Sequence, residues 1–109
     1  MKPPALSNEQ REYARRVAAE ARRERADVRA SLRDGRVTVI HVLDSPIEAH
    51  QRMRVRDVVL ALPGIGPIRC AEILEAAGIA STKRVGGLTE HQRERLLRRL
   101  ADRAKETTR

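Results

Sequence analysis

The sequence predicts an all-α protein in which a long N-terminal helix precedes a small helical bundle. Apolar residues recur at spacings of three and four along most of the 109-residue chain, which is typical of helices. Ser7, Ser45 and Thr89 each stand three residues before Glu or Gln, the pattern of a helix N-cap. The most strand-like run, residues 37–43, has no second strand with which to pair, and an isolated strand leaves its backbone polar groups unsatisfied.

The first predicted helix begins at Ser7 and runs to about Arg33, where Asp34 and Gly35 end it. The preceding residues, 1–6, contain two prolines and no periodicity, so we expect a flexible arm. An apolar stripe along the helix is strongest near the C-terminal end, and we expect that end to dock on the rest of the protein. The stripe consists of Tyr13, Val17, Ala21, Val28 and Leu32.

A second stripe on the same helix is basic. At about 100° per residue its members fall within roughly 80° of the helix surface. They are Arg11, Arg15, Arg22, Arg25, Arg29 and Arg33. The acidic residues lie off this stripe, although pairs such as Glu12 with Arg15 also fit an ordinary solvated helix. Two interpretations stay open: a solvated face, or a second nucleic-acid contact through Arg11, Arg15, Arg22, Arg25 and Arg29.

Three shorter helices are expected before residue 63. The first begins at Thr38 and keeps His41 on its surface. Its buried residues are Val39, Val42 and Leu43. The second has Ser45 as its N-cap and ends near Gln51. The third carries apolar residues at helical spacing, namely Met53, Val55, Val58, Val59 and Leu62.

The stretch LPGIGPIRCAEIL is predicted to be a tight loop that leads into a helix. Pro63 ends the preceding helix because its ring clashes with a continuing helix and it has no N–H. Gly64 and Gly66 can take positive φ and let another backbone come close, and Pro67 suits the first turn of the next helix. Outward amide N–H groups, the helix dipole and Arg69 together predict a clamp for nucleic-acid phosphates. The alternative is an ordinary helix–helix turn.

The helix after this loop is expected over residues 67–77, with Gly78 as its stop. Cys70 lies on it and is interpreted as a small buried hydrophobic residue. Residues 79–88 form a linker, and the last helix starts at Thr89. We therefore divide the chain into a flexible arm (1–6), a long basic helix (7–34), a compact domain (35–104) and a polar tail (105–109).

Composition narrows the function. Lys and Arg number 23 against 15 acidic residues, which gives a net charge of +8. Arg is the commoner cation and suits forked phosphate contacts. With one Tyr and no Phe or Trp, the core must be aliphatic and thin. A basic helical chain of this kind is most simply a nucleic-acid backbone binder, and the alternatives are an acidic protein or an anionic lipid as partner.

Other function classes are not indicated. No apolar run is long enough to span a bilayer, and the N-terminus lacks the apolar segment of a signal peptide. A single cysteine fits a cytoplasmic chain without an internal disulfide. The three histidines are scattered, and no Cys, His and carboxylate cluster has metal-ligand spacing. We therefore expect a monomer that is not an enzyme, with no metal, no cofactor, no small-molecule substrate and no membrane partner.

From about Met53 to Leu100 the chain resembles a helix-two-turns-helix, or helix-hairpin-helix, module. The stretches LPGIGPIRCAEILEAAGI and STKRVGGLTEHQRERL look like those of two groups, a small-subunit ribosomal protein and the actinobacterial integration host factors. The long Ala/Arg/Glu helix before the module, the Met53-Arg54-Val55 segment and the short chain after the last helix resemble the second group.

This resemblance implies an all-α, nucleoid-associated protein that binds duplex DNA with little sequence preference and bends or compacts it. It implies contacts from the hairpin and from a basic lid loop that covers the DNA. On this sequence those contacts fall on Pro63, Gly64, Ile65, Gly66, Pro67 and Arg69, and then on Thr82, Lys83 and Arg84. Pro67 stands where the family often has Lys, and Gly86 where a further basic residue is usual, so the resemblance implies fewer phosphate contacts at these two positions. The alternative is a ribosomal or other structured-RNA-binding protein with the same module.

Overall fold

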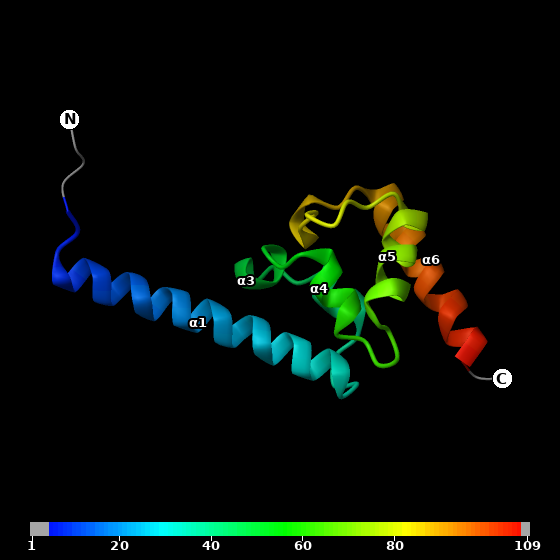
Figure 1. Cartoon of the computed structure of the whole chain (residues 1–109), viewed down its shortest axis with the longest axis horizontal. Coiled ribbons are helices and arrows are strands. Elements are labelled where there is room, and N and C mark those ends of the chain that lie inside the picture. Colours follow the sequence, from blue (N-terminus) through cyan, green and yellow to red (C-terminus); the bar gives the residue numbers. More distant parts are fainter. Residues whose placement is uncertain (1–4, 108–109) are drawn as a thin grey trace.

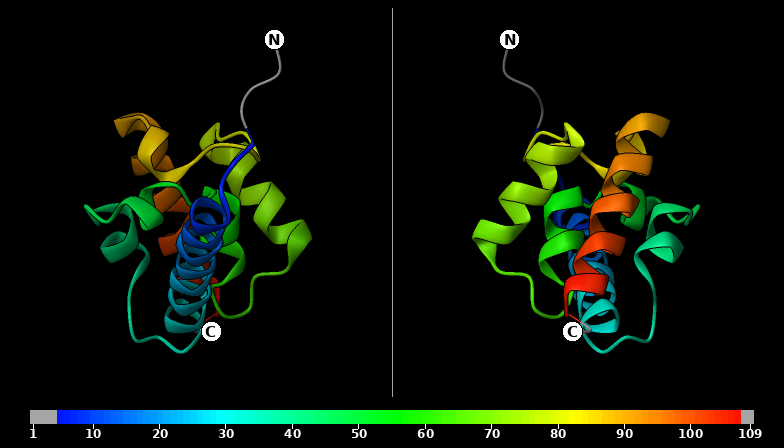
Figure 2. Two further views of the ribbon diagram at one scale, coloured as in Figure 1. Left: turned by 90° about the vertical axis from the view of Figure 1, so that its left-hand side faces the viewer. Right: turned by 90° about the vertical axis from the view of Figure 1, so that its right-hand side faces the viewer.

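The protein is helical, which confirms the predicted fold class. A computed structural model describes residues 5–107, with side chains for residues 5–103. Within this part of the chain the elements are α1 (Asn8–Arg33), α2 (Val39–Leu43), α3 (Glu48–Gln51), α4 (Val55–Leu60), α5 (Pro67–Ala77), the 3-10 helix η1 (Val85–Gly87) and α6 (Glu90–Thr107). The shorter helices gather near the C-terminal part of α1, whose N-terminal part projects away from them (Figures 1 and 2).

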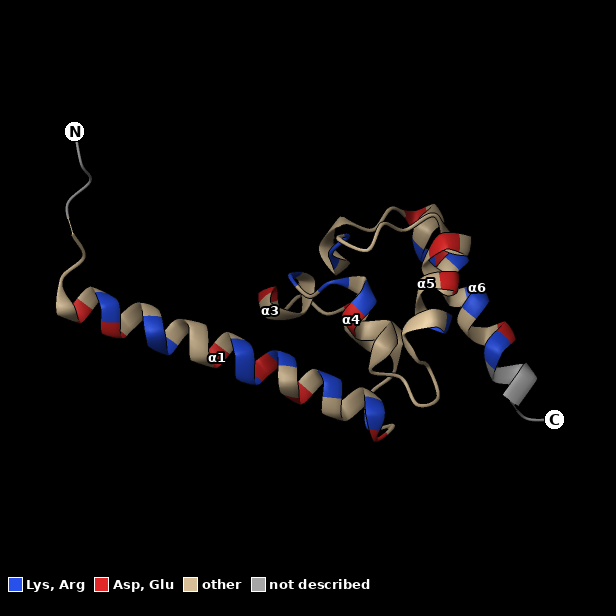
Figure 3. Ribbon diagram, viewed as in Figure 1, with Lys and Arg blue, Asp and Glu red and all other residues tan. Residues whose placement is uncertain are grey.

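The helix α1 begins at the predicted capping box. The Ser7 hydroxyl accepts from the Gln10 amide at 3.1 Å, and the Gln10 side chain accepts from the Ser7 amide at 2.8 Å. Acidic and basic positions are interspersed along its whole length (Figure 3). No helix among the described residues is long and apolar enough to cross a bilayer. Val28 and Leu32 are buried, whereas Tyr13 and Val17 are exposed. The C-terminal end therefore docks, as predicted.

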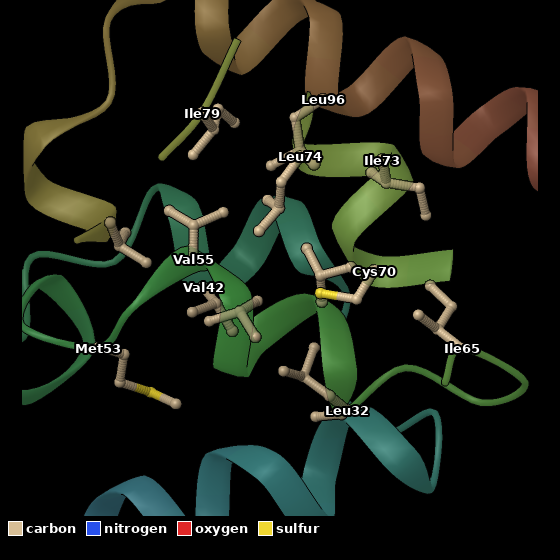
Figure 4. Close-up of a cluster of buried hydrophobic side chains, with 14 of the residues drawn as sticks. Leu32, Val42, Met53, Val55, Ile65, Cys70, Ile73, Leu74, Ile79 and Leu96 are labelled. Carbon is tan, nitrogen blue, oxygen red and sulfur yellow. The ribbon is translucent and has the colours of Figure 1, made fainter. Parts of the chain in front are cut away.

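The core is aliphatic and has α4 at its centre. Val55, Val58 and Val59 of this helix are fully buried, and burying a side chain of this size contributes about 1.5–3 kcal/mol. Leu32 approaches them from α1 and Leu96 from α6 (Figure 4). No aromatic side chain joins this core, because the single Tyr lies on the projecting part of α1.

The two short helices before α4 begin differently from one another. Thr38 caps α2 through its hydroxyl, which accepts from the His41 amide at 3.2 Å, and His41 is exposed, so both predictions are confirmed. The prediction that Ser45 caps the next helix is wrong, because α3 begins after Ile47. The Ser45 hydroxyl instead accepts from the Ile47 amide at 3.2 Å and lies 2.7 Å from His50 Nδ1.

His50 fastens α3 to α1. Its ring is buried, and its Nε2 lies 3.0 Å from Glu24 Oε1 while its Nδ1 faces the Ser45 hydroxyl. A carboxylate can only accept a hydrogen bond, so in this arrangement Nε2–H donates to Glu24 and the serine hydroxyl can donate to Nδ1. Every polar atom of the ring is thereby satisfied, as a buried histidine requires.

The segment before α4 is extended rather than helical, so the prediction of a helix starting at Met53 is wrong. Arg54 pairs with Arg84 in an isolated antiparallel bridge. Two main-chain hydrogen bonds flank the bridge: the Val55 amide donates to the Lys83 carbonyl, and the Val85 amide donates to the Met53 carbonyl, each at 2.9 Å. Met53 is buried beneath this pairing. Long-range backbone pairing has thus replaced the first helical turn.

The helices α5 and α6 pack side by side and are tied where one ends and the other begins. Gly78 ends α5 in the left-handed conformation, as predicted, with φ of 69°. Thr89 and Gln92 form the predicted capping box of α6, and Gln92 Nε2 also donates to the Gly78 carbonyl at 2.9 Å. The backbone of α6 continues to Thr107, into the segment assigned to the polar tail. Residues 1–4 and 108–109 of the predicted arm and tail lie outside the described residues.

One exposed ion pair links α2 to α6 and makes stability depend on pH. Arg93 hydrogen-bonds the Asp44 carboxylate at the end of α2. This hydrogen bond, and secondarily the charge of Arg93, holds the pKa of Asp44 below its ordinary value. Because the folded-state pKa is lowered, the stabilisation is fully present above the unfolded pKa of about 3.9 and is lost as the pH falls through the lowered value.

We therefore predict that Asp44→Asn lowers the melting temperature at pH 7, and that this difference from the parent is smaller at pH 3, below the unfolded pKa of about 3.9. Thermal unfolding followed by far-UV circular dichroism at both pH values measures it. Asp34→Asn, which removes an exposed carboxylate paired with Arg36 instead, is the matched control. A destabilisation by Asp44→Asn of the same size at both pH values would contradict the assignment.

Candidate nucleic-acid interface

The loop between α4 and α5 carries the predicted phosphate clamp, and its two glycines differ in conformation. Gly64 has φ of 80°, the left-handed region in which a side chain is strained. Gly66 has φ of −93° and ψ of 179°, so only Gly64 takes the positive φ that both glycines can adopt. The reason is its place in the fold, because Gly66 is the N-cap of α5 and N-caps are extended.

The hairpin has amide donors that the protein does not use, one of them at the start of α5. Within the described part of the chain, neither the Gly64 nor the Gly66 amide donates a hydrogen bond. The Gly66 carbonyl accepts from the Cys70 amide at 2.9 Å, which begins the helical pattern, and Pro67 has no N–H. Amides at the positive end of a helix dipole form a binding site for anions such as phosphate.

The hairpin side chains divide between core and surface. Ile65 is buried and anchors the loop in the core (Figure 4), so its side chain does not belong to the outer surface. Pro63, Pro67 and Arg69 are exposed. The Pro63 carbonyl accepts a hydrogen bond from the Arg103 guanidinium, which ties the loop to α6.

The lid loop, Thr82 to Arg84, is fixed to the body rather than free. The two main-chain hydrogen bonds of the Arg54–Arg84 bridge hold it. Ile79 and Val85 are buried on either side of it. Arg84 Nη1 donates to the Arg52 carbonyl at 2.7 Å, and Thr82 and Arg84 are exposed while Lys83 is half-buried. The hairpin precedes α5, whereas the lid loop follows it in the chain and lies beside the segment before α4 (Figure 1).

Gly86, where the resemblance leads one to expect a basic residue, packs closely against α3. A Cβ at this position would stand 3.3 Å from the Gln51 Cβ and 3.3 Å from the Gln51 carbonyl oxygen. A larger residue would require the loop to move away from α3. The absence of a side chain at Gly86 thus lets η1 pack closely against α3.

The basic stripe of α1 is partly free and partly docked. Arg11, Arg15 and Arg22 are exposed, whereas Arg25 and Arg29 are half-buried near the body. Arg15 forms an ion pair with Glu12 at 2.9 Å. The stripe therefore runs from the projecting half of the helix into the bundle.

Sequence reasoning placed Arg52 and Arg54 on no site, yet both line a hollow with Arg25 and Arg84. This hollow lies between α1, the α3–α4 segment and the lid loop, where the basic positions of the last two lie side by side (Figure 3). The signal was available in the sequence. Arg and apolar residues alternate through Arg52-Met53-Arg54-Val55, the period of an extended segment with one exposed face.

Cys70 is confirmed as a buried hydrophobic residue. Its side chain is 1% exposed, and its Sγ contacts the Arg56 carbonyl oxygen at 3.6 Å. Burial raises the pKa of the thiol, more than the nearby Arg56 charge lowers it. Because the thiolate is the nucleophile, these surroundings make the residue inert.

Comparison with known proteins identifies the family. Residues 32–100 match the model of the S13-like H2TH domain. The chain is 37% identical over 91 residues to the integration host factor of Streptomyces coelicolor, and the match spans 82% of this chain and 85% of that protein. The chain belongs to the actinobacterial integration host factor family. It is also 38% identical over 96 residues to the integration host factor of Mycobacterium tuberculosis, across 86% of this chain and 91% of the relative.

A solved structure of this family is similar in fold. The structure of sIHF bound to an 8bp palindromic DNA superposes with a TM-score of 0.74 at 34% sequence identity. The match covers 77% of this chain and 97% of that one. The recognition of the helix-two-turns-helix module and of the integration host factor family from sequence is thus confirmed.

The two hairpin glycines should differ in their response to substitution. Gly64→Ala places a side chain in the left-handed region and should lower the free energy of unfolding by about 1 kcal/mol. At Gly66 a Cβ meets no protein atom within 4 Å, so Gly66→Ala should change it by less than about 0.5 kcal/mol, since poorer capping and lower unfolded-state entropy offset one another. Urea unfolding measures both variants, and equal destabilisation would contradict the assigned conformations.

Proposed function

We propose that this integration host factor family member is a nucleoid-associated protein that binds duplex DNA with little sequence preference. The observation that carries the proposal is the hairpin: the Gly64 and Gly66 amides donate no hydrogen bond, and Gly66 is the N-cap of α5, whose first turn carries the exposed Arg69. The likeness to sIHF bound to DNA supports it, as does the net charge of +8. We place its action in the cytoplasm, at the nucleoid, as a monomer without catalytic activity.

In this mechanism the hairpin binds consecutive phosphates of one strand. The glycines allow the backbone to approach the phosphates closely, and the N-terminus of α5 attracts them. Arg69, one turn into the helix, adds a charge-assisted contact. The proposed hairpin contacts are Pro63, Gly64, Ile65, Gly66, Pro67 and Arg69, with Ile65 contributing through its backbone because its side chain is buried.

The lid loop holds the facing strand or enters the minor groove. Its contacts are Thr82, Lys83 and Arg84. Residues 67–81, which include α5, separate it from the hairpin in the sequence, and its backbone pairs with the segment before α4. Because the hairpin and the lid loop are both tied to the core, two strands that contact them would be held at a spacing set by the protein, which supports bending or compaction.

The proposed contacts recognise shape and charge. Backbone amides and guanidinium groups read phosphates, which carry no sequence information. Any preference for particular sequences would then follow from how readily the DNA deforms. The α1 stripe extends the charged surface beyond the hairpin and lid through Arg11, Arg15, Arg22, Arg25 and Arg29.

Electrophoretic mobility shifts of a duplex across a salt series test the hairpin. The logarithm of affinity should fall with the logarithm of salt concentration by about 0.9 per neutralised phosphate. Gly66→Ala, which leaves the free protein without a clash, should weaken binding about tenfold or more by blocking a charged hydrogen bond. A flat salt response, or full affinity in Gly66→Ala, would contradict the clamp.

Competition with structured RNA distinguishes the proposed DNA ligand from the alternative, an RNA ligand. The ribosomal relatives of the module raise RNA as the rival ligand, and A-form helices present different phosphate spacing. In the same assay an excess of double-stranded RNA should displace duplex DNA poorly. Preferential displacement by RNA would replace the proposed ligand.

The α1 stripe is tested with a matched pair of variants. Arg11→Gln with Arg22→Gln removes two exposed stripe residues, and Arg16→Gln with Arg23→Gln removes two exposed residues of the same helix outside the stripe. Only the first pair should reduce the salt slope, by up to about 1.8 if each residue meets one phosphate. It should also reduce capture of a labelled duplex by an immobilised one if α1 bridges two duplexes. Equal effects of the two pairs would identify a merely solvated face.

A further inference from the structure

Four arginine residues line one hollow beside the lid loop. Its lining consists of Arg25, Arg52, Met53, Arg54, Asp57 and Arg84. The arginines come from separate places in the sequence: α1, the end of α3, the extended segment before α4 and the lid loop. We call this feature the arginine hollow. Four cations and one carboxylate give its lining a net charge of +3.

Two of these arginines are forced together by the backbone. Arg54 and Arg84 are paired in the antiparallel bridge, and the flanking hydrogen bonds run between residues 55 and 83 and between residues 85 and 53. This pattern defines a non-hydrogen-bonded pair, in which the Cα atoms are about 4.5 Å apart and the side chains are at their closest. Like charges directly opposite one another destabilise a pair. The bridge therefore keeps two cations together against their repulsion.

The hollow contains fewer anionic partners than cations. Arg52 is paired with Glu48 at 2.8 Å. Arg84 donates to the Arg52 carbonyl at 2.7 Å, which fixes its guanidinium but leaves its charge uncompensated. Arg25 and Arg54 form no ion pair with any residue between 5 and 103, and Asp57 faces Arg56 at 3.7 Å. A bound anion would relieve the repulsion that the protein leaves in place.

We propose that the arginine hollow binds the polyphosphate group of a small phosphorylated molecule, such as a nucleoside diphosphate. A terminal phosphate carries a charge of about −1.5 to −2 at neutral pH. Two adjacent phosphates therefore match the net charge of +3 in the lining of the hollow. Guanidinium forks suit phosphate oxygens. A concave site surrounded by cations fits a compact terminal group, whereas a DNA strand spreads its charges along a rod at about 3.4 Å per phosphate.

Such a ligand would compete with nucleic acid. Arg84 belongs to the proposed lid contacts and Arg25 to the proposed α1 stripe, so a polyphosphate in the hollow removes both from DNA. This competition rests on the proposed function, but occupancy of the hollow does not. The two can therefore fail separately.

Direct titration of the full-length protein with inorganic pyrophosphate, at constant ionic strength and without DNA, tests occupancy. The arginine Nε–Hε resonances report which side chains respond, and those of Arg25, Arg52, Arg54 and Arg84 should shift together. Arg54→Gln should weaken pyrophosphate about tenfold, because a hydrogen bond between charged groups is lost. Its exposed side chain makes no ion pair among the described residues, so the fold should be unaffected.

Arg23→Gln is the matched control, since it removes one exposed cation from α1 outside the hollow. It should change pyrophosphate affinity less than twofold. Equal weakening by the two variants, or shifts spread over all arginines, would overturn the site in favour of non-specific attraction. ADP should bind at least as tightly as pyrophosphate and displace duplex DNA from the parent but less from Arg54→Gln. If Arg54→Gln weakens DNA while pyrophosphate leaves all four resonances unmoved, the hollow is a DNA subsite and the proposal is wrong.

Discussion

The positions of the exposed basic groups depend on two main-chain hydrogen bonds. They join Val55 to Lys83 and Val85 to Met53, segments about thirty residues apart in the sequence. Without them the chain after α5 would be an open connection, and its cations would have no fixed relation to the hairpin. With them, α5 is held between two anchored ends, and Arg84 is placed opposite Arg54. A pairing of only one residue on each side therefore determines the geometry of a charged surface.

Local signals made most helix boundaries predictable. The caps at Ser7, Thr38 and Thr89 are bonds to an amide three residues away, so the residues that decide them lie within one helical turn. Ser45 has the same local pattern but failed as a cap, because its hydroxyl is turned toward the buried ring of His50. The start of α4 was misplaced for a similar reason, since the lid loop pairs with residues that would otherwise complete a helical turn. The second error arises where a distant contact outweighs local preference, whereas the contacts that divert Ser45 lie within five residues of it.

The same distinction applies to the surface. Proline and glycine act on their own backbone, and so the hairpin and the start of α5 could be located from the sequence, although the conformation of Gly66 follows from its role as an N-cap. The arginine hollow could not be assembled in this way, because Arg25, Arg52 and Arg84 meet only after the chain folds. Seen together, the hairpin, lid and α1 stripe are neighbours of one small core. The surface around that core is positive because Lys and Arg outnumber Asp and Glu by 23 to 15.

The thin aliphatic core has a practical consequence for anyone observing this protein. The only aromatic residue, Tyr13, is 64% exposed and lies on the half of α1 that leaves the bundle. Its absorbance and fluorescence therefore sense the projecting helix and report almost nothing about packing around α4. Loss of tertiary structure would change near-ultraviolet spectra very little, whereas a partner that binds the projecting half of α1 would change them. The chain thus carries a natural optical label at the place where its helix meets solvent.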